Sequence, residues 1–63
     1  MYSVIYECEG VVHQIGPFNT EEEADNAAKT AQAEGEFDIS DQNVYLMHPD
    51  HRMVEYSMAD LGV

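Results

Sequence analysis

Carboxylates dominate the groups in this sequence that could do chemistry. Thirteen aspartate and glutamate residues face only two basic residues, Lys29 and Arg52, which gives a formal net charge of −11 over 63 residues. Such a surface repels nucleic acid and anionic membranes, and it attracts cations and the basic surfaces of other proteins. The charge therefore predicts binding to a basic protein partner, without direct contact to nucleic acid or membrane.

The carboxylates gather in separate stretches. Residues 21–25 hold four of them, and residues 34–41 hold four more. Carboxylates on neighbouring helical turns lie about 6 Å apart, and a nucleic-acid duplex carries one charge per ~1.7 Å of its axis. A folded surface of spaced carboxylates could therefore occupy a lysine- and arginine-rich groove that binds DNA or RNA. The residues expected to pair with such a groove are Glu21, Glu22, Asp25, Glu34, Glu36 and Asp38.

Part of this acidity has a simpler interpretation. Glu21, Glu22 and Glu23 follow Thr20, at a position where the dipole of a helix favours negative charge. Glu34 lies near the predicted end of the same helix, where negative charge is unfavourable. The sequence therefore leaves two interpretations open, a functional acidic surface and a solvated one.

The spacing of the candidate ligand and catalytic residues gives little support for metal binding or catalysis. His48, Asp50 and His51 could bind a divalent ion, but a site needs three or four fixed ligands, and His-Pro-Asp-His is also typical of a turn. Cys8, the only cysteine, falls on the strand face predicted to be buried, where a thiol is inert. No phosphate-binding loop, dinucleotide motif or triad spacing is present. We expect no enzymatic activity, no cofactor and no metal.

The first half of the chain predicts a hairpin followed by a helix. Residues 2–8 and 11–15 alternate with the period of half-buried strands, and Gly16-Pro17 is expected to end the second strand. Thr20 and Glu23 form a capping box at the start of the helix. Alanines form one helical face, and Gly35 is a natural residue to end the helix.

The second half predicts an acidic loop and another hairpin. Residues 36–43 are ambiguous between loop and short strand, with Phe37 and Ile39 as anchors. Residues 44–48 and 52–57 are predicted strands joined by a turn, and residues 57–61 could form one helical turn. The chain is thus expected to be a single α+β domain over residues 1–63. One helix would pack on one face of an antiparallel sheet of about four strands, in the order ββαββ.

The cellular compartment of the protein can be predicted from its single cysteine and from the lengths of its apolar runs. A lone cysteine suits a reducing cytoplasm, and the sequence has no apolar run of membrane length. Because Met1 directly precedes a strand-like segment, we expect a complete chain without a signal peptide. The expected location is the cytoplasm.

Two resemblances add to this interpretation. Many small bacterial and phage proteins, some SPOR domains included, have a strand-to-helix junction of the form G-P-F-x-T-x-E-E-A, and residues 16–24, GPFNTEEEA, resemble it. This likeness implies local structure only, since no helix separates the first two strands as in a SPOR domain. In size, charge and single-domain make-up the chain is similar to small acidic phage proteins, including anti-CRISPR proteins and other DNA mimics. That likeness implies a non-catalytic inhibitor acting in the host-cell cytoplasm.

The sequence leaves two functions open, with the chain a monomer or a homodimer. In the first, a nucleic-acid mimic blocks the basic DNA- or RNA-binding groove of a bacterial defence complex, for example a CRISPR effector. In the second, a structural or adaptor module homodimerises through its open sheet face, and its acidity serves solubility. The sequence supplies apolar side chains for that contact but does not say which face of the sheet each one takes; they are Val4, Tyr6, Val44, Leu46, Val54 and Tyr56.

Overall fold

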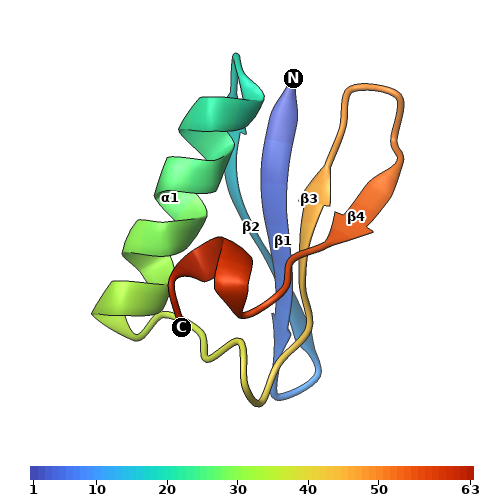
Figure 1. Cartoon of the computed structure of the whole chain (residues 1–63). Coiled ribbons are helices and arrows are strands. Elements are labelled where there is room, and N and C mark those ends of the chain that lie inside the picture. Colours follow the sequence, from blue (N-terminus) through green and yellow to red (C-terminus); the bar gives the residue numbers. More distant parts are fainter.

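The computed structural model describes all 63 residues as one four-stranded sheet with a helix on one face (Figure 1). The elements are β1 (Tyr2–Cys8), β2 (Val11–Phe18), α1 (Glu21–Glu34), β3 (Val44–Met47), β4 (Met53–Glu55) and a short 3-10 helix, η1 (Ala59–Leu61). The strand order is β2-β1-β3-β4, and every neighbouring pair is antiparallel. The predicted α+β fold in the order ββαββ is confirmed.

Strand β2 runs further than the sequence predicted. It continues through Gly16 and Pro17 to Phe18, where the prediction ended it at Ile15. The two residues Gly16 and Pro17 together lie opposite Ser3, so the strand contains a bulge at this point. Pro17 is tolerated because β2 is an edge strand, and the φ of +117° at Gly16 suits a residue without a side chain.

Helix α1 has the ends that the sequence predicted. The Thr20 hydroxyl accepts a hydrogen bond from the Glu23 amide at 3.2 Å, which caps the N-terminus. Gly35 follows the last helical residue in the left-handed region at φ +80°. There its amide and that of Glu36 bond the carbonyls of Gln32 and Ala31.

The core lies between the alanine face of α1 and the inner face of the sheet. Ala24, Ala28 and Ala31 are buried on the helix, and small side chains let the helix backbone approach the sheet closely. From the sheet, Val4 and Val44 are fully buried. Further buried side chains come from Phe37, Leu46, Tyr56 and Leu61. Phe37 anchors the acidic loop as predicted, and Ile39 packs against the core as a partly buried residue.

The second hairpin is shorter than predicted. Strand β3 ends at Met47 and β4 covers only Met53 to Glu55, where longer strands over 44–48 and 52–57 were expected. After β4 the chain leaves the edge of the sheet and passes under α1, where Tyr56 and Leu61 are buried in the core. The helical turn expected within residues 57–61 is present as η1, which lies beside α1 on the same side of the sheet (Figure 1).

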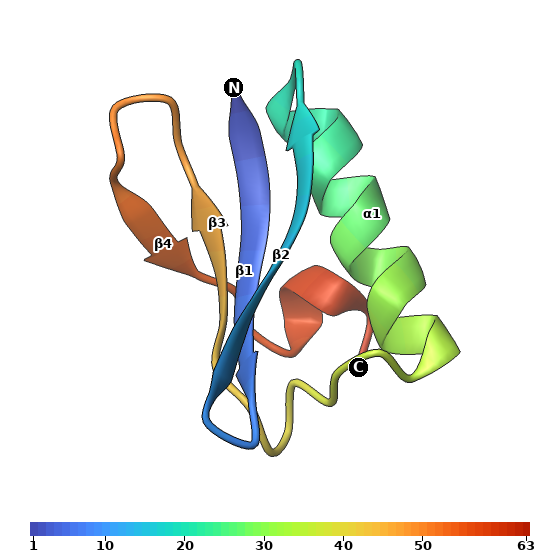
Figure 2. The same cartoon turned by 180° about the vertical axis from the view of Figure 1, so that it is seen from behind.

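The two faces of the sheet differ in what covers them. Helix α1 packs on β1 and β2, and no helix lies over the opposite face when the molecule is seen from behind (Figure 2). The strand register puts the open face of the sheet on Ser3, Ile5, Glu7, Val12, Gln14, Tyr45, Met47, Met53 and Glu55. With 14 residues and several charged side chains, α1 is too short and too polar to cross a membrane, and η1 is shorter still.

The apolar residues expected to serve a dimer contact lie on the other face. Val4, Val44, Leu46 and Tyr56 are buried beneath α1 and η1. Tyr6 pairs with Val44, and Val54 pairs with Leu46, so both share that inner face. These residues therefore cannot serve an open-face contact, and the sequence left this point open because strand alternation alone does not say which of the two faces the helix covers.

Candidate functional site

A groove of about 360 Å³ lies on the inner side of the molecule, between α1 and β4. It exists because α1 packs on β1 and β2, which leaves the β4 side of this sheet face uncovered. Leu46, Val54 and Tyr56 supply its apolar residues. Its charged residues are Glu21, Asp25 and Lys29 from α1 and Asp60 from η1. Glu55 of β4 also borders the groove, but the strand register puts its side chain on the opposite face of the sheet.

A hydrogen bond between Tyr56 and Asp25 ties the C-terminal segment to α1. The Tyr56 hydroxyl donates to Asp25 Oδ1 at 2.6 Å, and Tyr56 is only 9% exposed. Burial raises the pKa of Tyr56 well above its usual range, and the bond to the Asp25 carboxylate raises it further. The hydroxyl therefore stays protonated and holds one carboxylate oxygen of the groove in place.

Asp60 is held by Ser57 in a reciprocal pair of bonds. The Ser57 amide donates to Asp60 Oδ2 at 3.0 Å, and the Asp60 amide donates to Ser57 Oγ at 3.2 Å. The bond from the Ser57 amide lowers the pKa of Asp60, and the Ser57 hydroxyl and the charge of Lys29 lower it further. The Asp60 carboxylate is therefore fixed in orientation, and it stays ionised at pH values below the usual pKa of aspartate.

Glu21 lies beside His48 at the start of α1. His48 Nε2 is 3.8 Å from Glu21 Oε1, and the imidazole also meets the edge of the Tyr2 ring at 5.3 Å between ring centroids. The His48 side chain is 14% exposed and the Glu21 side chain 53% exposed. His48 thus packs within the protein, while the Glu21 carboxylate stays open to a partner.

No histidine belongs to a set of side chains large enough to bind a metal ion. No group of three or more His, Cys, Asp or Glu side chains is arranged to hold a metal ion. In the predicted turn, Asp50 Oδ1 accepts a bond from the Arg52 amide at 3.1 Å, and His51 adopts a positive φ of +67°. The segment is thus organised as a turn between β3 and β4.

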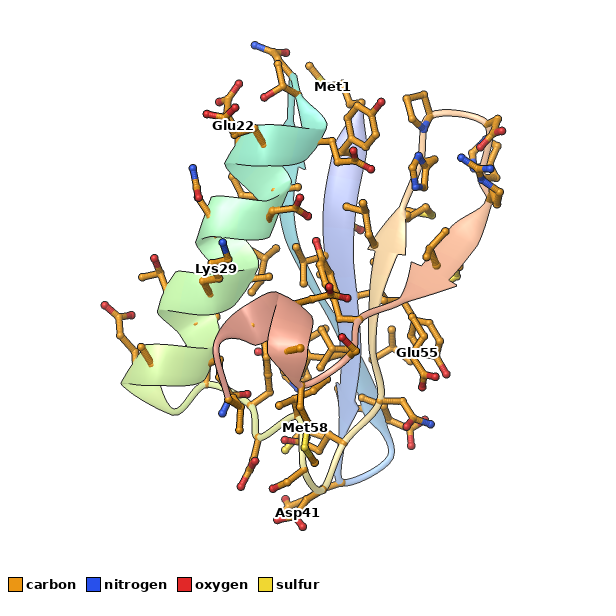
Figure 3. The ribbon with its side chains drawn as sticks, viewed as in Figure 1. Met1, Glu22, Lys29, Asp41, Glu55 and Met58 are labelled. Carbon is orange, nitrogen blue, oxygen red and sulfur yellow. The ribbon has the colours of Figure 1, made fainter.

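The structure divides the predicted partner-binding residues into two groups. Glu21 and Asp25 line the groove, and Glu22 projects from the outer side of the first turn of α1 (Figure 3). Glu34, Glu36 and Asp38 lie at the other end of the helix and in the loop after it. Asp25 and Glu34 are the members of the two groups nearest to each other on α1, and roughly 14 Å of helix separates them.

Two residues of the second group lie at a separate hollow of about 420 Å³ that Cys8 and Phe37 also line, and Glu34 lies outside it. Glu36 and Asp38 line it, but Asp38 has a structural role, since its Oδ1 accepts bonds from the Ser40 hydroxyl at 2.6 Å and the Ser40 amide at 3.0 Å. These two bonds, from the hydroxyl above all, lower the pKa of Asp38. Of the two carboxylates that line this hollow, those of Glu36 and Asp38, only Asp38 is held by these hydrogen bonds.

The sequence-based prediction did not include Asp60 as a neighbour of Glu21 and Asp25. Asp60 lies far from Glu21 and Asp25 in the chain and meets them only because η1 packs against α1. One signal was available for Asp60, since Ser57-Met58-Ala59-Asp60 has the spacing of a helix-start capping pair.

No family model, curated protein or solved structure matches this chain. The fold and the groove define the protein as a small, strongly acidic α+β domain with carboxylates from two elements, α1 and η1, gathered at one site. The charge of the chain and the geometry of the groove are therefore the basis for inferring its function.

Proposed function

We propose that this chain is a non-catalytic acidic binding protein that mimics nucleic acid and occupies the lysine- and arginine-rich groove of a nucleic-acid-binding protein. One observation carries the proposal. Carboxylates of α1 and η1 gather around a single groove that contains only one cation, Lys29. Clustered charge of one sign attracts a surface of the opposite sign and speeds their association.

The arrangement of the groove supports this function. Tyr56 and Ser57 hold Asp25 and Asp60 in fixed positions, so less conformational entropy is lost when these carboxylates meet a partner. The apolar residues of the groove offer contact to the aliphatic part of a lysine or arginine side chain. Glu34 and Glu36 would extend the charge contact from the other end of α1, over a length comparable to about six nucleotides of one strand.

The identity of the target stays a prediction from the sequence. A bacterial defence complex, of the kind that anti-CRISPR proteins inhibit, is the target suggested by the likeness in size and charge. Any such target must present a Lys/Arg-rich groove, and its enzymatic or DNA-binding activity would fall when the acidic protein binds.

A pull-down from a bacterial lysate tests the proposal. We expect the chain to capture a nucleic-acid-binding protein at low salt and to release it at high salt or when DNA or RNA is added. Glu21→Gln/Glu22→Gln should weaken capture, while the control Glu9→Gln/Asp41→Asn removes the same charge elsewhere, since Glu9 and Asp41 line one hollow and Asp41 lies at the opposite end of the molecule from Glu22 (Figure 3). Equal capture by both variants, or capture that nucleic acid does not compete, would contradict the proposal.

Lys29 provides a second, opposite test of the groove. Its ammonium lies among the carboxylates that are proposed to meet a basic partner, so it opposes that partner. Lys29→Gln should therefore bind the captured protein more tightly, by about threefold or more at low salt, in a competition assay. A weaker complex would show that Lys29 contacts the partner or supports the fold.

The alternative function, an adaptor that homodimerises through the open sheet face, now depends on a different set of residues. The apolar side chains on that face are Ile5, Val12, Tyr45, Met47 and Met53. Two copies packed through this face would bring Glu7 and Glu55 of each copy to an interface without a single basic residue. The negative charge of the open sheet face therefore opposes homodimerisation, and this favours the nucleic-acid mimic as the function.

A further inference from the structure

The apolar residues of the open sheet face form one continuous stripe. The register puts Met53 beside Met47, Tyr45 beside Ile5, and Val12 one row beyond, so the stripe crosses the sheet diagonally from β4 to β2. We call these five residues the open-face stripe. It lies on the side of the sheet opposite to α1, and no helix covers it (Figure 2).

The stripe is accessible to a partner. Val12 is 66% exposed and Met53 is 46% exposed, while Ile5, Tyr45 and Met47 are half-buried between their neighbours. Methionine adapts its shape to a partner surface, and a tyrosine is a frequent anchor of protein interfaces. The stripe thus has the composition of a contact surface and is not scattered exposure of single residues.

The charges around the stripe determine what can cover it. Glu55 borders it on β4, Glu7 borders it on β1, and none of the open-face residues is basic. A second copy would set carboxylate against carboxylate in addition to the net charge of −11 on each chain. A partner with lysine or arginine on both sides of an apolar strip would complement the face.

The dimensions of the face favour a helix as this partner. Strands lie about 4.8 Å apart, so four strands span roughly 15 Å, and one helix with its side chains is about 10–12 Å wide. Packing a helix on the second face of a sheet is also a common layer arrangement in domains. We propose that the open-face stripe docks the apolar side of a basic amphipathic helix from a partner protein. This proposal does not depend on the function of the groove, which lies on the other face of the sheet.

The experiment uses the full chain with labelled methionine and isoleucine methyl groups, observed by NMR. The probe is a synthetic amphipathic helical peptide of leucine and lysine, and the control is the same peptide with glutamate in place of lysine. We expect saturable shifts at Met47, Met53 and Ile5 with the lysine peptide, little change at Met1 and Met58, and no binding of the glutamate peptide. Shifts at Met58 without shifts at the stripe would overturn the proposal.

A matched pair of variants separates the stripe from general attraction to a negative protein. Met53 and Met58 are both 46% exposed, but only Met53 lies on the stripe. Met53→Ser should weaken the affinity for the lysine peptide about fivefold or more, while Met58→Ser should leave it within twofold. Equal weakening by both variants would contradict the proposal.

Other occupants of the face give distinct results. Sedimentation equilibrium that shows a dimer, together with concentration-dependent shifts at Met47 and Met53, would assign the face to a second copy and overturn the proposal. Shifts of the same methyl groups on adding phosphatidylserine vesicles would assign it to a membrane, with the same consequence. The variant Glu21→Gln/Glu22→Gln should keep peptide docking, so failure of the groove function and failure of this proposal can be told apart.

Discussion

At the scale of single residues, Tyr56 connects the groove to the stability of the fold. Its hydroxyl donates to a charged acceptor, Asp25, from a site that is nearly closed to solvent. Tyr56→Phe keeps the ring but loses this bond, and it should cost about 1–2 kcal/mol of unfolding free energy in a urea titration. Tyr45→Phe on the open face is the control, with an expected change within about 0.5 kcal/mol. Equal effects would show that the bond to Asp25 contributes nothing.

A second residue-scale prediction concerns acid stability. The pKa of Asp60 is lower in the folded chain than its ordinary value, because Ser57 donates to its ionised form. The folded state therefore binds a proton on Asp60 less readily than the unfolded state, and stability falls as the pH drops below about 4. In Asp60→Asn this part of the fall is absent, so urea midpoints at pH 5 and pH 3 should differ less than in the unaltered chain. An unchanged difference would contradict this linkage.

At the scale of elements, the C-terminal end of α1 depends on Gly35. The backbone there adopts φ +80°, and nothing lies within 4 Å of where a side-chain carbon would be, so a substitution meets only the conformational cost. Gly35→Ala should destabilise the chain by about 1–2 kcal/mol, and Gly35→Asn by less, because asparagine tolerates this conformation better. Thermal unfolding measures the order. A larger loss with asparagine would argue against a backbone origin.

The elements also show how far the sequence could predict this structure. Strand alternation, the Thr20 cap and the residue after the helix end, Gly35, are local signals, and they gave the ββαββ order correctly. The run of β2 through Gly16-Pro17 was not predictable, because a proline is allowed only where the strand is at an edge, and the strand order is a tertiary property. The same limit hid the association of Glu21 and Asp25 with Asp60, which depends on the packing of η1 against α1.

At the scale of the whole molecule, the net charge of −11 sets how the fold responds to salt. Self-repulsion of like charges destabilises the compact state, and added ions screen it over about 10 Å at 0.1 M. The melting temperature should therefore rise when sodium chloride is increased from 10 mM to 200 mM. The variant Glu9→Gln/Asp41→Asn has two fewer charges and should show a smaller rise. A melting temperature that falls with salt would mean that attractive charge pairs outweigh the repulsion.

The bulge in β2 has a further consequence for the molecule in concentrated solution. A free strand edge is a template on which another chain can add, and it is the usual starting point for fibres. Here one edge carries Pro17, which has no amide hydrogen, and a bulge that bends the strand, while the other edge, β4, has only three residues. Both edges are therefore poor templates for sheet extension. Repulsion between the acidic chains adds to this protection, so the protein should resist aggregation even though a stripe of methionine, valine and isoleucine stays open on its surface.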